Sequence, residues 1–162
     1  MLGFEAGFSP WGIDNYRFEV TGMFVNKDRA ERAIKNAERE FRNAVTSMVE
    51  GDYAGALKYF QECMEYSVKT VLIAYGIDYP KVHEVGRFLY EVEEKYPRWF
   101  TKEIPTIADV ADSLARGRPR FRYPYEYPTE ELGAIVKEIH PKVEEALENC
   151  KRLIKQLFER VP

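Results

Sequence analysis

Four arginines in the second half of the chain alternate with other residues and could together bind phosphate. They are Arg116, Arg118, Arg120 and Arg122. If the segment is extended, their side chains share one face at intervals of about 6.6 Å, close to the interval between phosphates along a single nucleic-acid strand. Guanidinium groups bind phosphate through paired hydrogen bonds and also stack on bases. The spacing therefore predicts an anion-binding loop.

Aromatic residues interleave with these arginines, and acidic residues follow them. The rings are those of Phe121, Tyr123, Tyr125 and Tyr127, and such rings can stack on a base. Tyr123 is therefore a candidate ligand-binding residue beside the arginines. Glu126 lies within the same segment, and Glu130 and Glu131 follow it. The arginines could instead pair with carboxylates of this chain, of a second subunit or of another anionic protein.

The chain has two histidines, His83 and His140. His83 follows a Tyr-Pro turn and comes two residues after Lys81, so both are candidates for contact with a phosphate or a base. Helix capping or a backbone hydrogen bond is the alternative role for His83. His140 precedes Pro141 and is expected to have a structural role. General acid–base chemistry by a histidine pair would require the two to meet.

The elements that would position these residues are helices. Apolar residues recur at helical spacing from about 28 to 49 and from 53 to 75. Asp52 can cap the start of the second helix, and Gly76 stands where a left-handed terminating residue is expected. The short connection at Gly51 predicts an antiparallel helical hairpin.

The rest of the chain is also predicted to be helical. A third helix is expected at about 85–96, ended by Pro97, and a shorter one at about 106–116. Prolines at 119, 124 and 128 predict an open loop. The last helix should run from Thr129 to about 158, with a kink or restart near His140 because Pro141 follows. The fold class is all-α, an up-and-down bundle of four main helices plus a short extra helix.

Residues 1–25 lack a helical period and are treated as a separate segment from the bundle at 26–162. The apolar residues between 18 and 24 suggest a short strand or an extended arm. Its aromatic residues, Phe4, Phe8, Trp11, Tyr16 and Phe18, should lie against the bundle or a neighbouring subunit, because they would otherwise be exposed.

Bulk properties narrow the classes of partner. The net charge of the 162 residues is −3, so any contact with nucleic acid must come from a local patch. Cys63 and Cys150 form no metal-binding motif, so neither a metal nor a cofactor is predicted. The sequence shows neither a signal peptide nor a run of apolar residues that could span a membrane. A cytoplasmic protein without a membrane partner is expected.

The order of these features resembles the HEPN domain family over residues of about 26–158. The residues that carry the resemblance are Gly51, Asp52, Tyr53, Gln61, Glu65, Lys69, Gly76, Ile77, Tyr79, Pro80, Lys81 and His83, and Arg122–Pro124 is similar to the family's A-R-Y-P segment. The resemblance implies a homodimer that pairs with a minimal nucleotidyltransferase in a toxin–antitoxin-like module.

Ribonucleases of that family carry an Arg-x(4–6)-His signature, which is absent here. Positions 76–78, before His83, are Gly, Ile and Asp, and positions 133–135, before His140, are Gly, Ala and Ile. The resulting interpretation is a non-catalytic dimer that binds a nucleotide or partners a nucleotidyltransferase. An RNA-binding protein or atypical ribonuclease that uses His83 and the arginine segment is one alternative. A structural helical dimer without a ligand is the other.

Overall fold

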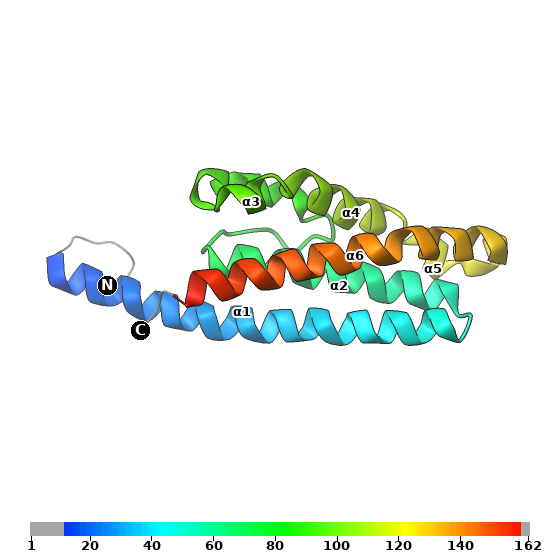
Figure 1. Cartoon of the computed structure of the whole chain (residues 1–162), viewed down its shortest axis with the longest axis horizontal. Helices are drawn as coiled ribbons and strands as arrows, with labels where there is room; N and C mark the ends of the chain where they lie inside the picture. The colour runs from blue at the N-terminus through cyan, green and yellow to red at the C-terminus, as the bar shows by residue number, and fades with distance from the viewer. Residues whose placement is uncertain (1–11, 160–162) are drawn as a thin grey trace.

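The computed structural model describes residues 12–159, and it describes side chains from residue 26 onward. Every regular element in that range is a helix. They are α1 (Gly12–Val49), α2 (Tyr53–Ala74), α3 (Arg98–Thr101), α4 (Ile104–Arg116), α5 (Pro119–Arg122) and α6 (Thr129–Phe158), with the 3₁₀ helices η1 (Gly86–Lys95) and η2 (Pro124–Glu126). Helices α1, α2, α4 and α6 run alternately in opposite directions along the long axis (Figure 1). The predicted all-α, up-and-down fold is confirmed.

The α1–α2 hairpin forms through local signals in the sequence. Gly51 adopts a φ of 79°, a left-handed conformation that costs glycine little. The backbone N–H of Asp52 then donates to the carbonyl of Ser47 at 2.8 Å, which closes the end of α1. The Asp52 carboxylate accepts from the backbone N–H of Gly55 at 2.9 Å and caps α2. The expected cap and hairpin are confirmed.

Helix α2 is the centre of the core. It packs against α1, α6, α4, α5 and η1. Figure 1 shows α1 and α6 running alongside it, with η1, α3 and α4 forming a further layer. Its inward side chains are fully buried, among them Phe60, Met64, Val68 and Leu72. Polar groups on the opposite side of α2 are therefore held by a rigid element. No helix in the described part of the chain is both long and apolar enough to cross a membrane.

The segment expected as a third main helix is a 3₁₀ helix, and α4 is the fourth long helix instead. Within η1, Val92 leaves helical geometry with φ −130° and ψ 39°. Three glutamates, Glu91, Glu93 and Glu94, lie in the second half of this segment. They repel one another and stand at the negative end of a helix, which disfavours a longer α-helix there. The end at Pro97 was predicted correctly.

The N-terminal segment differs from the expectation of a strand or extended arm. Helix α1 already begins at Gly12, so residues 12–25 are helical. No proline occurs between residues 12 and 49, and extending an existing helix is far less costly than starting one. In Figure 1 this part of α1 (blue) extends beyond the end of α6 (red). The expectations for residues 1–11 and for the aromatic side chains up to Phe18 lie outside the described residues and side chains.

The arginine segment is helical, so the prediction of an extended loop with four arginines on one face was wrong. Arg116 ends α4, and Pro119 begins α5. A proline fits the first turn of a helix as well as it fits a loop, because its missing N–H is not needed there. Helical spacing turns successive alternate residues to different sides. The four arginines therefore cannot form one row.

Helix α6 continues through Pro141 to Phe158, so of the expected kink or restart near His140 the restart was wrong. Its apolar side chains are buried on both sides of the proline, including Val136, Val143 and Leu147. This packing against α2 holds both halves in one helix although proline removes a backbone hydrogen bond.

Candidate functional site

Three polar residues of α2 lie one turn apart on the same side of the helix, and a histidine from the following loop joins them. Oε1 of Glu65 accepts from Nε2 of Gln61 at 2.9 Å, and its Oε2 accepts from Nζ of Lys69 at 2.7 Å. Nδ1 of His83 lies 3.0 Å from Oε1 of Glu65. Glu65 is therefore the hub of a network that connects α2 to a loop 18 residues later.

The loop that carries His83 begins at Gly76, whose φ of 67° turns the chain back along α2. Tyr79 then places its ring 5.7 Å from Nζ of Lys69, within the range of a cation–π contact. Beyond His83, the backbone N–H of Gly86 donates to Oδ1 of Asp112 in α4 at 3.0 Å. Contacts on α2 and α4 thus fix the loop at both ends.

The network lowers the pKa of the Glu65 carboxyl. Burial by itself raises the pKa of this carboxyl, but the hydrogen bonds from Lys69, His83 and Gln61 together outweigh burial. Glu65 is therefore held as a carboxylate. The contact with Glu65 orients the imidazole of His83. Because the side chain of His83 is 52% exposed, a ligand can still reach it.

A cleft of about 680 Å³ opens beside this network, between α1, α2 and the His83 loop. We call it the His83 cleft. Its polar lining includes Asn26, Arg29, Lys69, Lys81 and His83, with Glu65 and Asp78 as the acidic members. Among the residues that the structure describes, neither Arg29 nor Lys81 forms an ion pair. The cleft therefore has two unneutralised cations, one on α1 and one on the loop.

The other side of the network borders a smaller, acidic pocket of about 240 Å³, which is lined in part by Glu40, Glu62 and Glu65. The pKa of Glu62 is raised, first by burial and then by the charge of Glu40. An anion would be repelled here. Within the described residues, no group of three or more His, Cys, Asp or Glu side chains could hold a metal ion.

The predicted arginine site is divided between two places. Arg116, Arg118, Arg122 and Tyr123 line a pocket of about 520 Å³ together with Glu84. Arg120 lines a different groove, between α4 and α6, where Nε donates to the carbonyl of Gly117 at 3.4 Å. Lys81 and His83 do not line that pocket; they line the His83 cleft.

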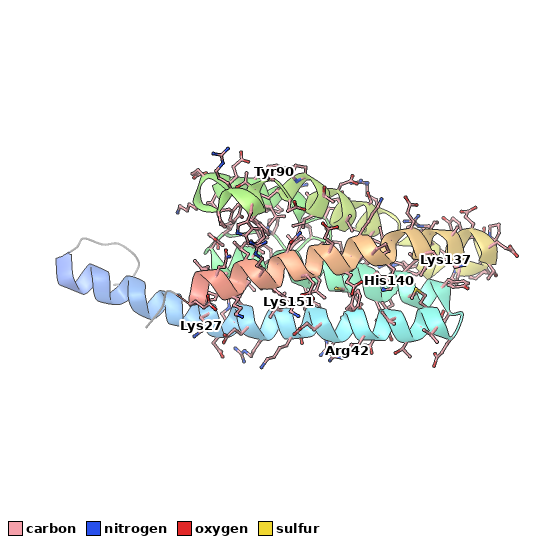
Figure 2. The ribbon with its side chains drawn as sticks, viewed as in Figure 1. Lys27, Arg42, Tyr90, Lys137, His140 and Lys151 are labelled. Atoms are coloured by element: carbon pink, nitrogen blue, oxygen red, sulfur yellow. The ribbon has the colours of Figure 1, made fainter. Side chains whose placement is uncertain are left out.

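The two histidines are in separate environments. His140 projects from α6 toward the other long helices (Figure 2), and its ring lies 5.7 Å from the rings of both Phe41 and Phe60. His83 instead contacts Glu65. These contacts agree with a structural role for His140. The two histidines have different partners, so they do not form an acid–base pair.

Sequence reasoning missed Asn26, Arg29 and Asp78 as cleft residues. Arg29 resembles the other basic residues along α1, and nothing local distinguishes it. Gln61, Glu65 and Lys69 were noticed as a motif without a role. Their spacing of four residues is the signal that could have identified one polar face.

Comparison with known proteins identifies the family. The model of the HEPN domain family matches residues 30–161, which is most of the chain. No curated protein and no solved structure matches the chain. The matched range includes nearly all of the helical bundle, the Glu65 network and the arginine segment. The chain belongs to the HEPN domain family.

Proposed function

We propose that this protein binds a nucleotide in the His83 cleft and has no catalytic activity of its own. The observation that supports this most is a pair of cations, Arg29 on α1 and Lys81 on the loop, that line one open cleft with His83 and form no ion pair within the described residues. Phosphate oxygens are the ligands that guanidinium, ammonium and imidazole donors share. Tyr79 lines the same cleft and offers an aromatic ring to the base of a nucleotide.

The preformed network supports a binding role. Lys69 is neutralised by Glu65 at 2.7 Å, so its charge does not add to the attraction for an anion. Arg29 and Lys81 supply that attraction, while Glu65 fixes the imidazole of His83 before a ligand arrives. The absence of an Arg-x(4–6)-His signature argues against metal-independent cleavage of RNA.

The family suggests the biological setting of this proposal. We infer a cytoplasmic homodimer that partners a minimal nucleotidyltransferase in a toxin–antitoxin-like module. A nucleotidyltransferase uses a nucleotide as its substrate, so a partner that binds the same nucleotide is chemically consistent with that setting. Co-purification of a nucleotidyltransferase with the tagged protein from its native cells would test the partnership.

Replacing both Arg29 and Lys81 with alanine should weaken the binding of ATP at least tenfold. Each lost charge-assisted hydrogen bond costs about 1.5–3 kcal/mol, and about 1.4 kcal/mol corresponds to a factor of ten in affinity. Isothermal titration calorimetry measures the change. Arg32→Ala is the matched control, because Arg32 is on the same helix, pairs with Asp28 at 3.2 Å and does not line the cleft. It should bind ATP as the wild type does.

Equal binding by the double variant and the wild type would refute the cleft as the nucleotide site.

A generic RNA incubated with the pure protein should stay intact. Cleavage by the wild type that disappears in His83→Ala would contradict the non-catalytic part of the proposal. The pair of His83 and Glu65 would then be read as an oriented acid–base group.

The protein should be a homodimer in solution. Helix α1 extends beyond the end of α6 (Figure 1), and the sequence of the first 18 residues is rich in aromatic residues. Burial against a second copy would remove apolar surface from water. Light scattering at micromolar concentration should give about twice the mass of 19.0 kDa. A deletion of residues 1–18 should shift the equilibrium toward monomer, whereas a monomeric full-length chain would contradict the prediction.

A further inference from the structure

We propose that Arg116, Arg118 and Arg122, which line the 520 Å³ pocket at the end of α4, hold the phosphate of a nucleotide unit while Tyr123 stacks on its base. We call this the arginine pocket. It is a second site, and it does not depend on the His83 cleft. The ligand chemistry is a phosphate joined to a planar base, which a free nucleotide or a single strand of RNA can supply.

Arg118 lines the pocket with a guanidinium group that has an unsatisfied donor. Its Nη1 nitrogen is shielded from solvent and has no hydrogen-bond partner among the described residues. A buried donor without a partner is costly, and a guanidinium carries a full charge. Because Arg118 lines the pocket, a turn of its flexible side chain toward a bound phosphate would give this donor an acceptor.

The other two arginines are available to the same ligand. Arg122 is exposed and forms no ion pair within the described part of the chain. Arg116 contacts Glu84 at 3.2 Å, but the side chains of this pair are 56% and 44% exposed. An ion pair so open to water contributes little, so Arg116 can turn to a doubly charged phosphate. The pocket is thus lined by three guanidinium groups and a single carboxylate, that of Glu84.

The aromatic part of the site lies beside the cations. Tyr123 lines the pocket and is 51% exposed, and Tyr125 is 78% exposed. Their ring centroids are 6.4 Å apart and the rings are nearly perpendicular, so Tyr125 can cover at most one face of the Tyr123 ring. An exposed ring next to an arginine cluster is the arrangement with which proteins stack a base and hold its phosphate.

The short helix α5 also supplies an internal control. Arg118 and Arg122 are one turn apart and line the arginine pocket, whereas Arg120 lies between them in sequence and lines the groove between α4 and α6. The three residues have the same charge and lie within five positions. A difference between their variants would therefore report the pocket, because the net charge changes equally in each.

The test measures binding of a fluorescent ten-nucleotide RNA by polarisation, with the unlabelled RNA, AMP and pyrophosphate as competitors. The protein carries Arg29→Ala and Lys81→Ala, so that the His83 cleft does not contribute. Arg118→Ala or Arg122→Ala should each weaken binding at least tenfold. When both arginines are replaced, the binding of RNA should also depend less on salt. Arg120→Ala should change binding less than twofold. Exposed Arg122 keeps the test valid if Arg118→Ala does not fold.

The aromatic half has its own comparison. Tyr123→Ala should weaken the binding of RNA and of AMP about tenfold and leave the binding of pyrophosphate unchanged. Tyr90→Ala is the control, because Tyr90 is 43% exposed on η1, away from the pocket (Figure 2). RNA that competes at least tenfold better than AMP indicates a strand, and comparable competition indicates a free nucleotide; both support the site. Equal effects of Arg118→Ala and Arg120→Ala, or no effect of Tyr123→Ala, would overturn it.

Discussion

Gly86→Val is expected to lower the free energy of unfolding by about 3 kcal/mol, because no side chain fits at this position. A Cβ atom on residue 86 would lie 2.8 Å from Cα and 2.9 Å from the carbonyl oxygen of Ala108. Both are backbone atoms of α4, so the segment 85–95 would have to move away from that helix. The move would also break the hydrogen bond from Gly86 to Asp112.

Thermal unfolding checks this prediction. For a chain of this size, a loss of 3 kcal/mol lowers Tm by about 6 to 12 °C. Gly117→Ala is the matched control, because the atoms nearest to its Cβ would all belong to the flexible end of the Arg120 side chain. Gly117→Ala should shift Tm by no more than a few degrees. A Gly86→Val protein as stable as the wild type would mean that η1 does not pack on α4 as described.

Glu65→Ala is expected to cost about 2–3 kcal/mol of stability at neutral pH. The substitution removes the acceptor for Gln61, Lys69 and His83 at once. It also leaves Lys69, whose side chain is only 22% exposed, without its carboxylate partner. Urea unfolding measures the loss. Binding in the His83 cleft should weaken as well, because the imidazole loses the carboxylate that orients it.

The cost of Glu65→Ala should depend on pH. The pKa of Glu65 is lowered in the folded protein from its ordinary value of 4.5. Its stabilising contribution is therefore complete above that value and is lost as the pH falls through the lower folded pKa. The difference between wild type and variant should shrink below about pH 4.5. A constant difference from pH 7 to pH 3 would contradict the network.

Glu62 offers a control with the opposite sign. Its pKa is raised by burial and by Glu40, so its charged form is unfavourable in the folded protein. A carboxyl with a raised folded pKa favours unfolding above that pKa and ceases to do so as the pH falls. Glu62→Ala should therefore be neutral or slightly stabilising at pH 7. If Glu62→Ala lowered the free energy of unfolding as much as Glu65→Ala, the loss would not be specific to the Glu65 network.

Local signals in the sequence were enough to determine the framework. Gly51 and Asp52 predict the hairpin, Gly76 predicts the end of α2, and Pro97 predicts the end of η1, because each acts through its own backbone geometry or an immediate neighbour. Helical periodicity predicted the all-α class, since a continuous apolar stripe needs a partner helix. The order of these signals also predicted the family.

Tertiary structure alone decided which side chains meet. Arg29 and His83 are far apart in sequence and line one cleft only because α1 and the loop both lie along α2. The four arginines appeared equivalent, since Pro119 permits either a loop or the first turn of a helix. Their separation into one pocket and one groove follows from the packing of α5 against α2. Sequence fixes torsional preferences within a few residues, whereas the direction of a side chain depends on how whole helices pack.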